Sequence, residues 1–280
     1  MKLSNKLLIG LSLLVYIVPL SAYISTRSGG IDSKEFYEKV NQESRSFNTP
    51  SKLLRPEKVK PFENIQLIGD ERIELYLVKD DVYGIKLVDN KKNTTKVSYG
   101  ANEELIIHVN SASYLANQIF IYAPSFHEIT LNGISLDNFV VDQDSISLNV
   151  IRGTNSFALG NERLKFVKAN FTKSKVNLKL GKGLQHLDLR LKDAAVVSNI
   201  SNLNHFLLTT ANSSYSMGKP EKEKAPSSIN PLLIKYFSIH TEGSSNIWFP
   251  EKVNIENIEG SLSDSTFIHL PITSLRKLIK

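Results

Sequence analysis

The stretch VNLKLGKGLQHLDLRLKD, from Val176 to Asp193, decides the fold class. Its two runs, VNLKL and LDLRL, alternate apolar and polar residues with the period of two that is typical of a β-strand with one buried face. Leu and Val fall on one face of each run, and charged or amide side chains fall on the other. The Gly-Lys-Gly between the runs, Gly181 to Gly183, predicts a tight turn. We expect two strands whose apolar row is buried and whose polar row faces water.

The same pattern continues from about residue 61 to the C-terminus, in short alternating runs separated by Gly, Asn, Asp, Ser or Pro. The two opening runs start about 11 residues apart, which is roughly half of a 20-residue coil. These features favour an all-β domain built as a right-handed β-helix, or solenoid, of short strands. A β-sandwich is the structural alternative, because it shows similar alternation.

Composition bounds the stability and the partners of the chain. Its 280 residues are 41% hydrophobic, enough for a sizeable core, and they include no cysteine, so that disulfides and thiolate metal sites are excluded. The net charge of +6 is spread along the chain without a basic stripe. Nucleic acid is therefore not an expected partner.

An uncharged apolar segment, LLIGLSLLVYIVPLSAYI, runs from Leu7 to Ile24 behind Lys2 and Lys6. Its roughly 18 residues would span about 27 Å as a helix, close to the thickness of a bilayer core. An uncleaved signal-anchor is favoured over a cleaved signal peptide, because Leu20 fits poorly at the third position of a cleavage site after Ala22. The lysines place the N-terminus in the cytoplasm. The expected location is the bacterial inner membrane, crossed once, with the bulk of the chain periplasmic.

Three regions are expected along the chain. Residues 1–25 form a cytoplasmic stub and the transmembrane signal-anchor helix, 26–60 form a polar linker with a short helix, and 61–280 form the extracytoplasmic β-helical domain. Asp32 and Glu35 are spaced as a capping box for the short helix. The charged segment MGKPEKEKAPSSINP, residues 217–231, interrupts the strand pattern and predicts a surface insertion.

The order of the first strand-like runs resembles a known family. KPFENIQLIGDERIELYLV, then ELIIHV, then QIFIYAPSFHEITLNGISL is similar to the opening of the GIN domain, the putative autotransporter-adhesin head domain. Phe62, Pro124 and the Asn132-Gly133 turn match a Phe-led first strand, a strand that ends in hydrophobic-x-Pro and a strand that closes in a small turn. The resemblance extends over about Lys60 to Lys280. It implies a right-handed β-helix exported into the envelope of Bacteroidetes-type bacteria, an adhesin label by analogy, and no assigned functional residue.

No catalytic, cofactor-binding or metal-binding residue is predicted. Asp142 and Asp144 would share a strand face if DQDSIS were extended, as paired carboxylates of β-helical hydrolases do, but a turn before SISLNV is favoured. The same stretch lacks the Gly and the further oxygen ligands of a calcium loop. The histidines show no metal-ligand spacing and are expected to be solvated: His108, His127, His186, His205, His240 and His269.

Two surface features remain. The stretch NIWFPEKV holds the only tryptophan, Trp248, beside Phe249. An exposed pair would stack on a sugar or contact a protein, whereas burial at an edge of the domain is the favoured interpretation. The basic C-terminal residues Arg276, Lys277 and Lys280 are expected to be solvated.

The sequence thus predicts a non-catalytic, membrane-anchored envelope protein whose adhesin-like β-helical domain serves adhesion, scaffolding or ligand binding without a cofactor. The expected partners are the membrane, through the N-terminal helix, and an envelope protein or a polysaccharide. The alternative is a carbohydrate-active enzyme that uses surface carboxylates on a β-solenoid, with Asp142 and Asp144 as the candidates.

Overall fold

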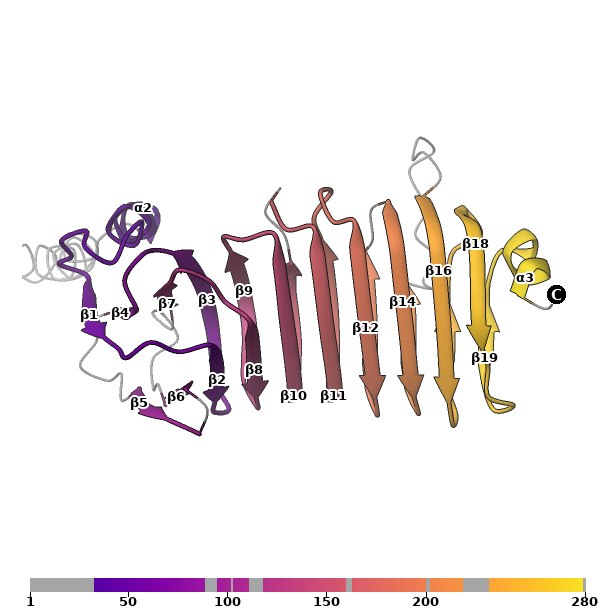
Figure 1. Cartoon of the computed structure of the whole chain (residues 1–280), viewed down its shortest axis with the longest axis horizontal. Coiled ribbons are helices and arrows are strands. Elements are labelled where there is room, and N and C mark those ends of the chain that lie inside the picture. The colour runs from indigo at the N-terminus through magenta and orange to yellow at the C-terminus, as the bar shows by residue number, and fades with distance from the viewer. Residues whose placement is uncertain are drawn as a thin grey trace, which may run out of the picture. The chain divides into compact units, whose positions relative to one another are not determined.

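The computed structural model describes residues 33–88, 95–101, 103–110, 118–159, 163–199, 202–218 and 232–278. The chain divides into two compact units, residues 1–43 and 44–280. The described part of the first unit is the helix α2 (Ser33–Glu43), in which Lys39 Nζ lies 2.6 Å from Glu35 Oε1 one turn away. In the described part of the second unit the regular elements are β-strands and one short helix at the C-terminal end (Figure 1).

The described elements of the second unit follow one another as β1 (Leu54–Lys58), β2 (Asn64–Ile68), β3 (Arg72–Lys79), β4 (Gly84–Val88), β5 (Lys96–Tyr99), β6 (Glu104–His108), β7 (Gln118–Ala123), β8 (Glu128–Asn132), β9 (Ser135–Val141), β10 (Ser145–Leu159), β11 (Phe166–Leu180), β12 (His186–Lys192), β13 (Ala195–Asn199), β14 (Leu203–Ala211), β15 (Ser214–Met217), β16 (Leu232–Glu242), β17 (Asn246–Trp248), β18 (Val253–Ser261), β19 (Phe267–His269) and α3 (Ile272–Leu278).

These strands form two mixed sheets. The five-stranded sheet has the order β1-β4-β7-β3-β9, with antiparallel pairing at β1/β4 and β4/β7 and parallel pairing at β3/β7 and β3/β9. The 14-stranded sheet follows the path β18-β16-β14-β12-β11-β10-β8-β2-β6-β5, and β13, β15, β17 and β19 continue from β11 as a second parallel row. In that sheet only the described pair β5/β6 is antiparallel.

The predicted right-handed β-helix of short strands is corrected by this pairing. A uniform helix would hold parallel strands of similar, short length, whereas here both sheets are mixed and the described strands range from three to 15 residues. The physical reason is that β4 runs antiparallel to both of its neighbours, β1 and β7, and so interrupts the parallel stacking of the first layers. The β-sandwich alternative, which needs antiparallel sheets, fails on the long run of parallel pairs.

The predicted membrane span is also corrected. Across the described ranges, the structure contains no helix that is both long enough and apolar enough to cross a bilayer. The segment Leu7 to Ile24, on which that prediction and the predicted single-pass inner-membrane location depended, lies outside the described residues. Most of the predicted insertion at 217–231 lies outside them too.

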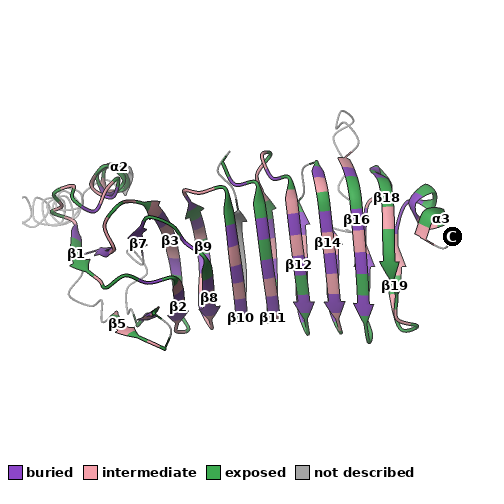
Figure 2. Cartoon of the chain, viewed as in Figure 1, coloured by how far each residue is buried: buried purple, intermediate pink, exposed green. Residues whose placement is uncertain are grey.

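The strand phase read from the opening stretch is confirmed. Leu187, Leu189 and Leu191 are buried, and the side chain of Arg190 between them is exposed. The two opening runs do not pair with each other: LDLRL pairs with the first half of β11, and VNLKL pairs with β13. Figure 2 shows the resulting alternation of buried and exposed residues along the strands.

Parallel register repeats with a nearly constant step. Ser147 pairs with Lys168, Lys168 with Asp188 and Asp188 with Leu207, which are steps of 21, 20 and 19 residues. Equivalent positions of successive layers therefore line up in rows across the sheet. Inward rows are apolar, and aromatic rings such as Phe206 and Phe237 stack inside at 5.1 Å between centroids.

A corner in each layer keeps the rows aligned. One residue per layer adopts a left-handed conformation directly after a paired residue, with φ values of 57, 50, 52, 48 and 60° at Arg152, Lys173, Asp193, Asn212 and Gly243. Such angles are uncommon for residues other than Gly and bend the chain sharply. At Gly243 a Cβ atom would collide with Asn212 Oδ1 of the preceding layer, so that the last corner has no room for a side chain.

Candidate ligand-binding groove

Four rings form a row on the outside of the 14-stranded sheet. Phe166 of β11 pairs with His186 of β12, His186 pairs with His205 of β14, and His205 pairs with Tyr236 of β16. Residues paired in this way lie about 4.8 Å apart with side chains on the same face. The sequence therefore forces the rings side by side, and we call them the aromatic row.

The rings of the aromatic row stack face to face. Their centroids lie 4.6 Å apart for Phe166 and His186, 4.6 Å for His186 and His205, and 4.9 Å for His205 and Tyr236, with interplanar angles of 19, 7 and 10°. Phe166 is 42% exposed and Tyr236 is 53% exposed. The inner faces are used within the row, so the surfaces offered to solvent are the ring edges and the outer faces of Phe166 and Tyr236.

The imidazole of His186 is neutral at pH 7. Partial burial lowers the pKa of His186 below its ordinary value of 6.5, and the adjacent His205 ring lowers it further because two imidazolium charges would repel each other. A neutral imidazole both donates and accepts hydrogen bonds. At His186 the row is therefore a hydrogen-bonding and aromatic surface at pH 7.

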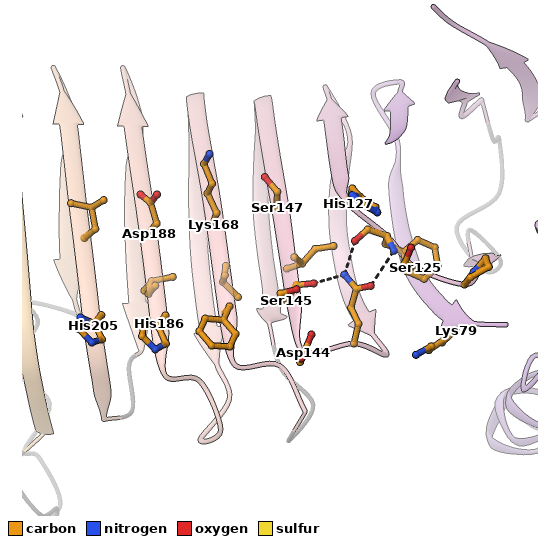
Figure 3. A pocket seen from close by; sticks show the side chains of 18 residues that line it. Lys79, Ser125, His127, Asp144, Ser145, Ser147, Lys168, His186, Asp188 and His205 are labelled. Carbon is orange, nitrogen blue, oxygen red and sulfur yellow. Dashed lines mark hydrogen bonds between the residues drawn. The ribbon is translucent and has the colours of Figure 1, made fainter. Parts of the chain in front are cut away.

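A groove of about 740 Å³ follows the aromatic row from β14 towards the start of β8 (Figure 3). Ring edges form one side of the groove. Figure 3 shows His205, His186 and Ser145 in one line across the strands and Asp188, Lys168 and Ser147 in a second, parallel line. The second line consists of the next outward-facing residue on each strand, namely Ser147, Lys168, Asp188 and Leu207.

The far end of the groove is held by a glutamine. Gln143, between β9 and β10, donates from Nε2 to Phe126 O at 2.8 Å and to Ser145 O, and its Oε1 accepts from Phe126 N at 3.1 Å. These bonds fix the segment before β8 against the start of β10. Lys79 and Asp144 are exposed and lie at this end of the groove (Figure 3).

The two carboxylates considered for catalysis lie in the connection between β9 and β10 and not on a strand. Asp142 Oδ1 accepts from Arg163 Nη1 at 2.7 Å. Asp144 lines the groove, while its backbone carbonyl accepts bonds from the amides of Lys165 and Phe166. Asp144 thus lies at the groove, whereas Asp142 forms an exposed ion pair with Arg163.

The structure stacks His186 on His205, and His127 lines the same groove at its far end. The other three histidines lie elsewhere. His240 Nδ1 lies 3.1 Å from Ser261 Oγ, His108 and His127 are exposed, and His269 stacks on Trp248. In the part of the chain that the structure describes, no three His, Asp or Glu residues gather as metal ligands. The sequence analysis missed the pairing of His186 with His205, although its signal was present: each directly precedes a strict alternation of buried and outward residues, one layer apart.

The remaining predicted surface residues have local partners. Phe249 is buried, whereas Trp248 is half-buried and its ring lies 5.9 Å from that of His269. Lys277 Nζ donates to Ile255 O at 2.9 Å and to Glu256 O at 2.8 Å, and so caps carbonyls of the last long strand. Lys280 lies outside the described residues.

Comparisons with known proteins add little. The chain is structurally similar to a crystal structure described as a "putative adhesin" from Bacteroides fragilis, with a TM-score of 0.36 and 15% identity, over 76% of this chain and 91% of that one. At this identity and TM-score the likeness assigns neither a fold nor a function to this chain. No family model and no curated protein matches the chain, so membership of the GIN-domain family is not shown.

Proposed function

We propose that the second unit is a non-catalytic, adhesin-like binding domain of the GIN type that holds a polysaccharide along its groove. The observation that carries the proposal is the exposed aromatic row beside the oppositely charged side chains of Lys168 and Asp188. Exposed aromatic rings flanked by hydrogen-bonding groups are typical of binding surfaces rather than of ordinary protein exteriors.

The groove has the shape of a site for a chain-like ligand. Its lining runs from the segment just before β8 across β10, β11, β12 and β14, which corresponds to about four strand spacings, or roughly 19 Å. It is open along this length and lies on rigid strands, so a ligand would meet preformed donors and acceptors. A preformed surface lowers the entropy cost of binding.

The charges of the groove suit hydroxyl groups. Lys168 and Asp188 are directly paired neighbours on β11 and β12. A donor therefore lies beside an acceptor, and their opposite charges do not select a strongly charged ligand. Among carboxylates considered for catalysis, Asp142 is engaged by Arg163. This arrangement supports binding without bond cleavage.

Isothermal titration of the full chain with four glycans tests the proposal: β-1,4-linked hexasaccharides of glucose and of N-acetylglucosamine, a mannan and a polyuronic acid. Lys168→Glu should weaken binding of whichever glycan is bound. The matched control is Lys175→Glu, the same change at an exposed position beyond the corner of the same strand. Absence of glycan binding, equal loss in both variants, or release of new reducing ends from the glycan would each refute the proposal.

A further inference from the structure

We propose that the surface above Ser145 is a ring-binding subsite in which a pyranose ring of the glycan stacks on the outer face of Phe166. The ligand ring would extend the aromatic row by one position. This inference rests on the proposed function and adds to it the place and the contact that recognise the sugar.

The register of the sheet creates the subsite. Ser145 of β10 pairs directly with Phe166 of β11, so the position above Ser145 is the next step of the row, about 4.8 Å from the Phe166 ring. Each of the three following steps is filled by a ring at almost this spacing. Ser145 is exposed and carries only a hydroxymethyl group, so a small side chain stands where the row would place its next ring.

The subsite is bounded on its far side. Gln143 ties the backbone of Phe126 to that of Ser145, which sets a wall at the end of the groove. The lining there includes the exposed side chains of His127, Asp144 and Lys168. A ring placed on Phe166 would therefore meet an aromatic face on one side and polar groups around its rim.

A sugar fits this combination better than other ring-bearing ligands. The negative face of an aromatic ring attracts the weakly positive C–H bonds on one face of a pyranose, while carboxylate, ammonium and imidazole groups bond its hydroxyls. A nucleobase would also stack, but its phosphates need a positive groove. In this groove Lys79 and Lys168 are balanced by Asp144 and Asp188, so it lacks the excess of positive charge that a phosphate backbone needs.

The opposite end of the row is less suitable. Tyr236 pairs with Asn257 of β18, and Asn257 Nδ2 donates to Lys235 O at 3.1 Å. The amide is thus fixed next to the tyrosine, in the position that corresponds to the small Ser145. This difference between the two ends provides a control within the same row.

The test fills the subsite with a ring from the protein itself. Ser145→Phe should extend the aromatic row and weaken glycan binding by about ten-fold or more, the loss expected from one stacking contact and the excluded hydroxyl contacts. Asn257→Phe adds the same ring at the other end and should leave the dissociation constant within about two-fold. Far-UV circular dichroism and the melting temperature report whether each variant is folded.

A second variant keeps the experiment decisive if Ser145→Phe does not fold. Phe166→Leu retains an apolar side chain at an exposed position and removes only the aromatic face, so it should weaken binding to a similar extent. If glycan binds and neither Ser145→Phe nor Phe166→Leu changes the affinity, the subsite is refuted while the proposed function stands. If no glycan binds the wild type, both the subsite and the proposed function are refuted. Both are also refuted if poly(U) binds the wild type and Ser145→Phe abolishes that binding.

Discussion

Leu189 offers the sharpest test of how the layers are held together. Its side chain is fully buried, and its paired neighbours in the inward row are Ala169 on β11 and Leu208 on β14. Because Ala169 is small, Leu189 fills much of the space between the two layers, and strands pinned on both sides by hydrogen bonds can collapse little. Leu→Ala substitutions in cores cost about 2–5 kcal/mol, more where the cavity persists, so we expect about 4 kcal/mol for Leu189→Ala.

The adjacent residue provides the matched control. The side chain of Arg190 is 52% exposed and its Nη2 lies 3.4 Å from Asp188 Oδ2, so Arg190→Ala should change the free energy of unfolding by no more than about 0.5 kcal/mol. Urea denaturation followed by circular dichroism measures both free energies. If the two variants lose the same stability, the assignment of inward and outward rows on β12 is refuted, and with it the placement of the aromatic row.

The remaining predictions concern pH and backbone geometry. The pKa of His186 is lowered in the folded state. The stability that its neutral imidazole contributes is therefore complete above pH 6.5 and is lost as pH falls through the lowered pKa. On acidification the melting temperature of the wild type should drop more than that of His186→Phe. Partial burial raises the pKa of Asp80, but hydrogen bonds from Phe47 N, Ser46 Oγ and Val82 N outweigh it and leave the pKa below 3.8. Asp80→Asn should cost about 2 kcal/mol at pH 7 in urea denaturation, a difference that must vanish as pH falls through the lowered pKa, and a difference that persists in acid would contradict it. Gly243→Ala should cost at least about 1–2 kcal/mol of stability through its left-handed backbone and the contact with the preceding corner. Gly218→Ala should cost less, because Gly218 has a positive φ but nothing near its Cβ position. Equal losses of stability in thermal melts would argue against the corner contact.

Local pattern predicted the strands, but not how they all pair. The phase of VNLKL and LDLRL follows from period-two alternation, which depends only on neighbouring residues. The direction of β4 against β7 depends on contacts between Gly84 and Tyr122, far apart in the chain, and no local signal records it. The predicted linker over residues 26–60 includes β1, because Pro56 is not expected inside a strand. The proline is tolerated there because β1 lies at the edge of its sheet.

The candidate groove was partly readable from the sequence. Each ring of the aromatic row directly precedes a buried residue that begins a strict alternation, namely Val167, Leu187, Phe206 and Phe237. Aligning these alternating runs would have placed the rings in one row. Metal and catalytic motifs are recognised by residues a short distance apart in the sequence, whereas neighbouring rings of the row are 19 residues or more apart. The far wall could not be predicted, since it depends on Gln143 bonding across to Phe126.

The length of the groove depends on the number of stacked layers, because each layer adds one strand spacing. Residues 186–204 comprise one step between positions paired in the sheet, since His186 pairs with His205. Removing them would bring Phe166 next to His205 in the same register and would shorten the groove by a single strand spacing, about 4.8 Å, while leaving both of its ends intact. The length of ligand that the groove can hold is therefore set by the number of layers. Duplication or loss of one layer would change that length by one strand spacing.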